Sequence, residues 1–203
     1  MTVQKRILDI ILSLLGLSIF WPIMLVIAAM ILIRDGRPIL FGTQRMKTHN
    51  QLFTLWKFRT MTPGADDGGG VSGADKDHRI TPLGRILRKY RLDELPQLWN
   101  ILLGEMSFVG PRPPLPRYVD LFPDLYQDVL KNRPGITGLA TLAFHKHEEI
   151  ILAQATSADQ TDQIYRRRCV PQKARLDRIY AAHSSICFDL WLIWKTIAKV
   201  MRF

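Results

Sequence analysis

The segment Ile10–Ile33 contains no charged residue, and this feature restricts the possible folds of the chain more than any other. A helix needs roughly 20 apolar residues to cross the hydrocarbon core of a bilayer, so this segment is long enough to enter a membrane. Pro22 lies near its middle, where a proline removes one backbone hydrogen bond and clashes with the carbonyl of Ser18. The sequence therefore predicts an N-terminal membrane helix that is interrupted at Pro22.

Basic residues flank this segment on both sides. Lys5 and Arg6 precede it, and Arg34 and Arg37 follow it. Cytoplasmic flanks of membrane helices are enriched in lysine and arginine, so both ends are expected on the cytoplasmic side. We therefore predict that residues 1–36 form a re-entrant hairpin, a helix-break-helix that returns to the side it entered. An ordinary transmembrane helix kinked by its proline is the alternative.

The whole chain is basic, with a net charge of +10 and a pI near 9.9. This balance predicts an anionic partner, either nucleic acid, a phospholipid surface or a phosphorylated substrate. Residues 1–61 hold eight lysines and arginines against two acids, so +6 of the charge surrounds the apolar segment. The distribution favours membrane lipid over nucleic acid. Cys169 and Cys187 are too few for a disulfide framework or a metal site, and we expect reduced thiols.

Residues 37–203 are predicted to form a single small domain of the α/β class, more closely a helix-rich α+β fold. Ile39–Gln44 and Gln51–Met61 have the composition of a β-hairpin, and Thr62–Asp77 is a Gly- and Asp-rich loop. Asn132–Gly138 is predicted to be a turn. Helices are expected from Thr81-Pro82 to Tyr90, in a segment ending near Lys131, and at about Phe144–Ala155, Asp159–Ala182 (interrupted at Pro171) and Ser184–Val200.

The last segment, Phe188–Phe203, is amphipathic. Trp191 and Trp194 alternate with Lys195 and Lys199, and tryptophan with long basic side chains is typical of the lipid headgroup region. The pattern is equally typical of a helix that packs on the core of the domain. The sequence thus allows an interfacial amphipathic helix without requiring one.

The adjacent carboxylates Asp93 and Glu94 are the strongest candidates for chemistry. Arg112 follows in a proline-rich turn, and Lys57 and Arg59 share one face of the second predicted strand. Carboxylates beside cations indicate a site for a metal ion and a phosphate. The alternative is that Asp93 only caps the next helix and Glu94 is only a favourable charge in its first turn.

Five motifs in this order resemble those of the bacterial sugar transferases, also called monotopic phosphoglycosyl transferases. The resemblance covers nearly the whole chain, and the five together are far more specific than any one alone. The matching residues are Lys5, Arg6 and Asp9 of Lys-Arg-x-x-Asp, Lys57–Met61 of Lys-Phe-Arg-Thr-Met, Leu92–Gln97 of Leu-Asp-Glu-Leu-Pro-Gln, Gly110–Pro113 of Gly-Pro-Arg-Pro, and Arg133–Gly138 of Arg-Pro-Gly-Ile-Thr-Gly.

The resemblance implies an enzyme that moves a sugar-1-phosphate from a UDP-sugar to polyprenol (undecaprenyl) phosphate and releases UMP, which begins the assembly of a polysaccharide or other glycoconjugate. It implies a monotopic protein of the bacterial inner membrane, with a re-entrant hairpin (1–36) and a catalytic domain (37–203) on the cytoplasmic face. Membrane lipids are the implied surroundings, and a homodimer is compatible with the sequence.

By this resemblance Asp93 is the nucleophile, which would carry the phosphosugar as a covalent intermediate. Two anionic reactants and a carboxylate repel one another, so we expect Mg²⁺ held by Asp93 and Glu94, with Glu94 alternatively assisting proton movement. The expected phosphate-binding residues are Lys57, Arg59, Arg88 and Arg112, with Arg133 either functional or bracing its turn, while His145 and His147 are expected to be surface residues.

The chain also departs from the family pattern. Trp21 stands before the membrane proline where the family often has serine, so Ser18 is the substitute hydroxyl we expect. After Gly138 the chain reads LATLAFHKHEE where many members read Trp-Ala-Gln-Val-Asn-Gly-Arg. The sugar is therefore not predicted, and the roles of Thr141–Ala155 and Thr62–Asp77 stay open.

Two other classes of function compete with the transferase. A membrane-tethered nucleic-acid binder fits the basic charge, but no nucleic-acid motif is recognised and the tryptophans lie near apolar segments. We therefore expect no nucleic-acid partner. A scaffold without catalysis has no need for Asp93, Glu94 and Arg112 together.

Overall fold

The computed structural model describes residues 1–62 and 79–201, so nearly all of the predicted loop Thr62–Asp77 lies outside the described residues. The predicted helix-rich α+β fold is confirmed. The helices are α1 (Val3–Arg34), α2 (Pro82–Lys89), the 3₁₀ turn η2 (Leu92–Glu94), α3 (Gln97–Leu102), α4 (Pro116–Leu121), α5 (Pro123–Val129), α6 (Leu139–Leu152), α7 (Ala158–Ile164), the π turn η3 (Tyr165–Cys169), α8 (Val170–His183) and α9 (Ile186–Val200), and the strands are β1 (Leu40–Thr48), β2 (Gln51–Phe58), β3 (Ser107–Val109) and β4 (Gly135–Thr137).

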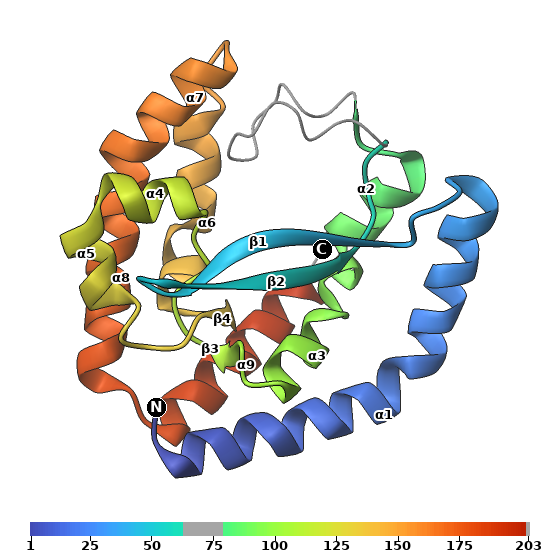
Figure 1. The fold of residues 1–203 in the computed structure, drawn as a ribbon, viewed down its shortest axis with the longest axis horizontal. Coiled ribbons are helices and arrows are strands. Elements are labelled where there is room, and N and C mark those ends of the chain that lie inside the picture. Colours follow the sequence, from blue (N-terminus) through green and yellow to red (C-terminus); the bar gives the residue numbers. More distant parts are fainter. Residues whose placement is uncertain (63–78, 202–203) are drawn as a thin grey trace.

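The predicted hairpin is confirmed as the antiparallel pair β1–β2, which crosses the middle of the molecule (Figure 1). Its first strand is longer than expected and continues to Thr48. Phe53 and Leu55 alternate along β2 and bury their side chains with Ile101 of α3. On the other side of the molecule, Met46 of β1 packs with Tyr118 of α4 in the core that α5 and α8 complete.

A second sheet, β3–β4, was not predicted, and the turn expected over Asn132–Gly138 contains one of its strands. The two strands are parallel and join chain segments that are far apart in the sequence. A Cβ atom on Gly110 would lie 2.1 Å from the carbonyl oxygen of Arg133, and one on Gly135 would lie 2.2 Å from the Gly110 nitrogen. Glycine at both positions therefore lets two of the family motifs pack backbone to backbone.

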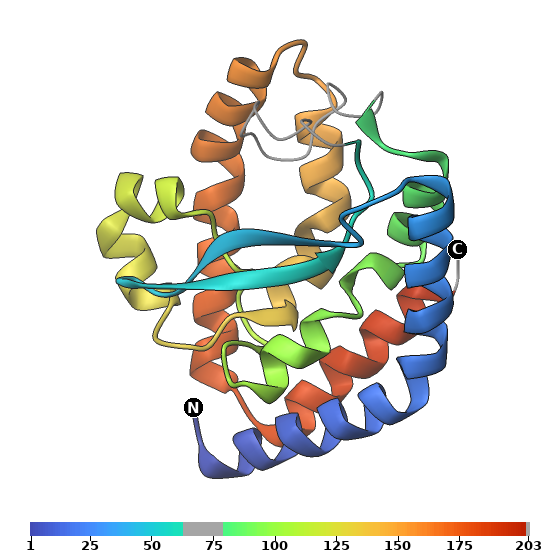
Figure 2. The ribbon, with the colours of Figure 1, turned by 45° about the vertical axis from the view of Figure 1, so that its right-hand side comes forward.

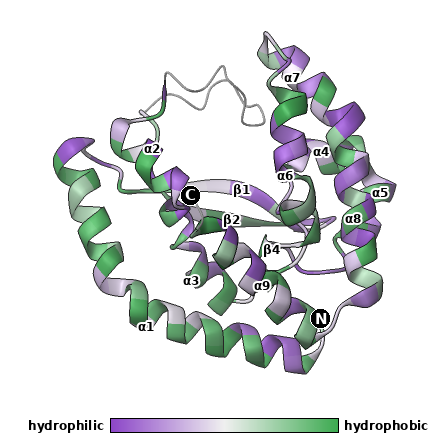
Figure 3. Cartoon of the chain, turned by 180° about the vertical axis from the view of Figure 1, so that it is seen from behind, coloured by the Kyte–Doolittle hydropathy of each residue, from purple (hydrophilic) through white to green (hydrophobic). Residues whose placement is uncertain are grey.

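Helix α1 is long and apolar enough to enter a membrane by its length and composition. It is continuous across Pro22, and its axis bends between the two halves, so the structure has a bend where an interruption was predicted (Figures 1 and 2). Only 11% of its most apolar 18-residue stretch is buried, and Figure 3 shows apolar residues along the length of the helix. The Ser18 hydroxyl, expected to support the proline, is exposed and makes no hydrogen bond within the described chain.

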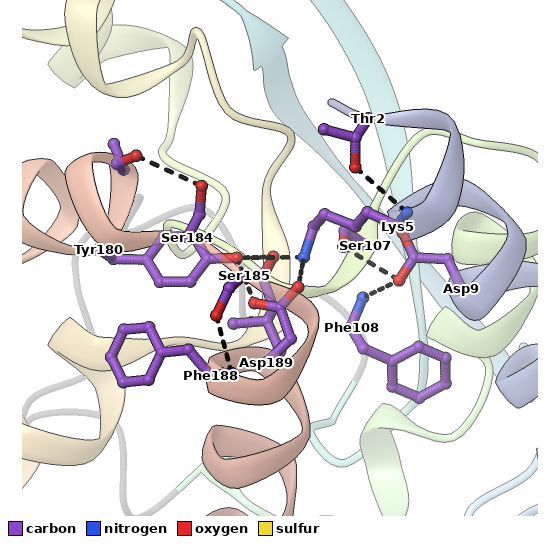
Figure 4. Close-up of polar contacts among 12 residues, drawn as sticks. Thr2, Lys5, Asp9, Ser107, Phe108, Tyr180, Ser184, Ser185, Phe188 and Asp189 are labelled. Atoms are coloured by element: carbon purple, nitrogen blue, oxygen red, sulfur yellow. Dashed lines mark hydrogen bonds and ion pairs between the residues drawn. The ribbon is translucent and has the colours of Figure 1, made fainter.

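The start of α1 is fixed to the domain by its charged residues (Figure 4). Lys5 pairs with Asp189 of α9, which also accepts a 2.6 Å hydrogen bond from Tyr180. Asp9 accepts hydrogen bonds of 3.1 Å from the Ser107 hydroxyl and from the amide of the next residue. Arg6 donates to two carbonyl oxygens at the C-terminal end of α3, at 2.7 Å each, and so satisfies groups that a short helix leaves unpaired.

The end of α1 is fixed by Arg59, which corrects one of our expectations. Its guanidinium is buried and donates to the backbone oxygens of Asp35, Gly36 and Arg37 at 2.5, 2.8 and 2.9 Å. The Asp35 carboxylate in turn accepts a 3.0 Å hydrogen bond from Thr81. Arg59 therefore holds the chain that leaves α1, because both of its terminal nitrogens donate to that chain rather than to the site of the carboxylates.

Helix α9 packs on the core of the domain, which is one of the alternatives left open for the C-terminal segment. Leu192 is fully buried against the domain, whereas Trp191 and Trp194 are 49% and 66% exposed. One face thus packs on the core, and the other presents tryptophan outward. In the preceding segment, the predicted interruption near Pro171 takes the form of the π turn η3, which joins α7 directly to α8.

Candidate active site

The carboxylates of Asp93 and Glu94 lie in the 3₁₀ turn η2, between α2 and α3. Both residues are buried, at 7% and 8% exposure. Helix α3 begins at Gln97 after Pro96, and no side chain caps it. The alternative that Asp93 is only a helix cap is therefore wrong, and these two buried charges need another explanation.

Three cations surround the Glu94 carboxylate. Lys57 Nζ lies 2.8 Å from one oxygen and Arg112 lies 3.4 Å from the same oxygen, while Arg91 lies 3.3 Å from the other. Burial alone would raise the pKa of Glu94, but the charges of Lys57, Arg112 and Arg91 outweigh it and hold that pKa well below its ordinary value. Glu94 therefore stays ionised and gathers the cations.

The environment of Asp93 is the opposite. Among residues 1–62 and 79–201, no group donates a hydrogen bond to its carboxylate. Burial, reinforced by the negative charge of Glu94, raises the pKa of Asp93, although Lys57 and the arginines at 88 and 112 oppose this rise. Two adjacent carboxylates thus have pKa values shifted in opposite directions, which is typical of groups with different chemical roles.

Arg88 reaches this site because α2 packs very closely on the strand end after β2. A Cβ atom on Gly84 would lie 2.2 Å from the carbonyl oxygen of Thr60, so only glycine allows the approach. Arg88 then donates a 2.8 Å hydrogen bond to the Thr60 hydroxyl. This bond holds its charge close enough to act on Asp93.

We expect Gly84→Ala to lower the free energy of unfolding by about 1–3 kcal/mol, because the backbone oxygen of Thr60 cannot move aside. Gly16→Ala in α1 is the matched control, since its added Cβ would meet only the flexible end of Leu98 at 3.2 Å. Thermal unfolding of both variants in detergent checks this expectation. Equal melting temperatures for the two variants would contradict it.

The structure brings together most of the predicted site residues and separates two of them. Lys57, Arg88 and Arg112 join the two carboxylates, whereas Arg59 holds the end of α1. Arg133 lies instead beside Gly104, where a Cβ atom would be 3.3 Å from its guanidinium and equally close to that of Arg6. Arg133 thus lies apart from the two carboxylates, and its buried Nη1 has no hydrogen-bond partner among the described residues.

Arg91 is a site residue that the sequence did not reveal. It is the one non-glycine residue with a positive φ, 53°, in the described part of the chain. Left-handed backbone in a residue of this kind is uncommon and tends to occur at functional sites. Here it ends α2 and turns the guanidinium toward Glu94. Neither the motifs nor the charge of the sequence predicts that Arg91 adopts a left-handed backbone conformation.

A cavity of about 620 Å³ is lined by Arg91 and Arg112, the two arginines that contact Glu94. Arg45 of β1, a second residue missed from the sequence, lies in its wall. His145 of α6 lines the cavity 3.5 Å from Glu149 with its side chain 35% exposed, and His147 is exposed, so both histidines lie at the surface as expected. The departing segment Thr141–Ala155 therefore supplies one wall of the space beside the site.

The oxygen atoms of Asp93 and Glu94 fit a magnesium ion that is held partly by the protein and partly by a substrate phosphate. No cluster of three or more His, Cys, Asp and Glu residues occurs among the described residues. Glu94 has both oxygens engaged by cations, while Asp93 has a carboxylate with no hydrogen-bond donor. Mg²⁺ is commonly held by one or two carboxylates together with substrate phosphates. The pair suits an ion that arrives with a phosphate ligand.

Comparisons with known proteins agree with these features. The bacterial sugar transferase family model matches residues 1–203. Over 202 residues the chain is 32% identical to the UDP-N-acetylgalactosamine-undecaprenyl-phosphate N-acetylgalactosaminephosphotransferase of Aeromonas hydrophila, with 97% of this chain and 43% of that protein covered. Over 200 residues it is 34% identical to the UDP-glucose:undecaprenyl-phosphate glucose-1-phosphate transferase of Klebsiella pneumoniae, with 97% and 40% covered.

A third relative is closer to this chain in length. The exopolysaccharide production protein ExoY of Sinorhizobium fredii is 30% identical over 213 residues, with 98% of this chain and 85% of that protein covered. The chain thus spans less than half the length of the first two relatives and most of the third.

Proposed function

Since the chain belongs to the bacterial sugar transferase family, we propose that it transfers a sugar-1-phosphate from a UDP-sugar to undecaprenyl phosphate or a related polyprenyl phosphate, releasing UMP. The names of the Aeromonas and Klebsiella relatives include this acceptor, which supports the proposal. The same names differ in their sugar, so the sugar of this chain stays open.

One observation carries this proposal most directly. The Asp93 carboxylate is buried and free of hydrogen-bond donors within the described chain, yet Lys57, Arg88 and Arg112 act on it electrostatically. A carboxylate left unpaired beside cations is available to attack a phosphorus atom whose oxygens those cations bind.

The proposed reaction has two displacements. First, an Asp93 oxygen attacks the sugar-bearing phosphorus, the bond from that phosphorus to the bridging oxygen breaks, and UMP leaves. Next, an oxygen of the polyprenyl phosphate attacks the same phosphorus and frees the Asp93 carboxylate. Lys57 and Arg112 neutralise the phosphate charge in both displacements, and Glu94 holds these cations in place.

Mg²⁺ belongs to the same proposal, with Asp93 and Glu94 as its protein ligands. When bound, the ion would neutralise charge on the phosphate oxygens. The oxygens of Asp93, which accept no hydrogen bond from the described residues, support this assignment. Both oxygens of Glu94 already contact cations, so Asp93 would be the main protein ligand.

We also propose that α1 is re-entrant, with residues 1–36 in the cytoplasmic leaflet of the bacterial inner membrane and residues 37–203 on its cytoplasmic face. The support is that both ends of α1 are fixed to the same domain, through Lys5 and Arg6 at its start and Arg59 at its end. A helix that crossed the membrane would place one of these ends on the far side. The exposed tryptophans of α9 fit the same membrane surface.

The topology predicts the outcome of cysteine labelling in sealed vesicles. In a Cys187→Ser background, Val3→Cys and Arg37→Cys are expected to react from the cytoplasmic side, and Trp21→Cys is expected to be shielded by lipid. The exposed Cys187 of the unmodified chain, on the domain itself, is the matched control. Reaction of the two end positions from opposite sides would contradict a re-entrant helix.

The function is tested by measuring UMP release. Purified protein in nanodiscs would be given undecaprenyl phosphate, Mg²⁺ and a panel of UDP-hexoses and UDP-N-acetylhexosamines. We expect UMP from at least one donor, with loss of release on addition of EDTA and recovery with Mg²⁺. A folded protein that releases no UMP from any donor would contradict the proposal and favour a scaffold without catalysis.

A further inference from the structure

One buried carboxylate beside the site has no part in the reaction described above. Asp177 of α8 lines the 620 Å³ cavity, is 8% exposed, and has one oxygen with no hydrogen-bond partner in the described chain. An unpaired polar atom of this kind lowers stability, so its presence calls for a compensating role. Burial raises the pKa of Asp177 to about 7, and Lys173 opposes that rise.

The cavity wall changes its chemistry between the reaction site and Asp177. Near the reaction site it carries Arg91 and Arg112, which both contact Glu94. Near Asp177 it carries aromatic side chains, Tyr126 among them, and a cation, Lys173, that is already paired with an acid. The first part suits phosphate, and the second suits a neutral polar group.

The polar groups around Lys173 leave Asp177 as the free acceptor. Lys173 pairs with Glu148 at 3.0 Å and donates to the Tyr165 hydroxyl at 3.5 Å. The charge of Lys173 is therefore already paired, and no described residue donates a hydrogen bond to the buried oxygen of Asp177. A ligand that enters here must bring its own hydrogen-bond donor.

We propose that this cavity holds the sugar of the donor, and that Asp177 accepts a hydrogen bond from one of its hydroxyl or amino groups. The inference rests on the proposed function and adds a sugar subsite to it. Aromatic rings such as Tyr126 and Tyr165 offer apolar surface to the C–H face of a sugar ring. The volume of about 620 Å³ lies within the range of small-molecule sites, roughly 300–1,000 Å³.

The nucleobase of the donor is the competing occupant, and the charge of the cavity argues against it. Uracil presents one N–H donor flanked by two carbonyl oxygens. A carboxylate that accepts from that N–H would face both oxygens, and Glu148 adds a second acid to the same wall. A sugar hydroxyl or amino group can turn toward Asp177 without this repulsion.

The test compares Asp177→Asn with Asp124→Asn, an exposed carboxylate on α5. UMP release is measured with the UDP-sugar that the wild-type protein uses, and UDP, which lacks the sugar, is titrated as an inhibitor. We expect Asp177→Asn to raise the KM for the UDP-sugar by roughly tenfold, because the neutral amide oxygen is a weaker acceptor than the carboxylate and the amide NH₂ brings a donor to the same position. Inhibition by UDP is expected to stay unchanged, and Asp124→Asn is expected to match the wild type in both.

Two results would overturn the inference. Equal weakening of the UDP-sugar and of UDP would place the nucleoside in the cavity, and a Asp177→Asn variant with wild-type constants would mean that Asp177 does not contact the donor. Tyr165→Leu removes ring surface offered to the sugar and serves as a second variant if Asp177→Asn does not fold; it too should raise the KM for the UDP-sugar and leave inhibition by UDP unchanged.

A binding measurement keeps this test separate from the proposed function. If the wild-type protein releases no UMP, the same UDP-sugars and UDP are compared by the rise in melting temperature that each produces. A larger rise with a UDP-sugar than with UDP, lost in Asp177→Asn, supports the sugar subsite without any turnover. Equal rises in both proteins would overturn it.

Discussion

Asp93→Asn is expected to reduce UMP release at least about a thousandfold while the protein stays folded. Asparagine keeps the size of the side chain but cannot form the acyl phosphate. Because burial and Glu94 raise the pKa of Asp93, the fold disfavours its charged form. A neutral side chain should therefore leave the free energy of unfolding at neutral pH unchanged or raise it. Turnover and thermal unfolding are measured on the same preparation.

Asp120→Asn is the control for this prediction, since it removes an exposed carboxylate from α4. It should release UMP at the wild-type rate. Near-normal UMP release by Asp93→Asn would contradict the assignment of Asp93 as the nucleophile. Loss of activity together with unfolding would show that Asp93 acts through stability instead.

Glu94→Gln is expected to reduce both turnover and stability, which distinguishes it from Asp93→Asn. Glutamine leaves Lys57, Arg91 and Arg112 without the charge that gathers them. Since these cations are 22%, 28% and 42% exposed and can regain water, we expect a loss of about 1–3 kcal/mol in the free energy of unfolding. A Glu94→Gln protein as stable as the wild type would mean that the three contacts contribute little.

The same ion pairs predict a pH dependence. The pKa of Glu94 is lower in the folded protein than its ordinary value of 4.5, so its contribution to stability is complete above that value. The contribution is lost as the pH falls below 4.5 toward the folded-state pKa. Melting temperatures measured between pH 3 and 7 should therefore fall less steeply for Glu94→Gln than for the wild type.

The elements that the sequence predicted well are those with local signals. The hairpin follows from two short segments rich in aromatic and β-compatible residues. Thr81 and Pro82 mark the start of α2, where the Thr81 hydroxyl accepts from the Gly84 amide at 2.9 Å. Asp93, Glu94 and Arg112 were found because their motifs are short and contiguous. Only the structure shows that these residues lie together with Lys57 at one site.

The elements that the sequence missed depend on contacts between distant segments. Strands β3 and β4 have three residues each, too few for an alternating pattern, and they pair across two intervening helices. Arg59 carried the same signal as Lys57, a cation in the same strand motif, yet its terminal nitrogens donate to the end of α1. Asp177 lies in a segment with no motif, so only its burial and its place in the cavity wall identify it as a candidate site residue.

The covalent intermediate is the central claim, and it can be measured without an acceptor. Wild-type protein mixed with its UDP-sugar and Mg²⁺, but no polyprenyl phosphate, should release a burst of UMP close to one equivalent. Mass spectrometry of the quenched protein should then find a sugar phosphate on the peptide that contains Asp93, and none in Asp93→Asn. UMP that forms only when the acceptor is present, with unmodified protein throughout, would contradict the two-step account and indicate direct transfer between the substrates.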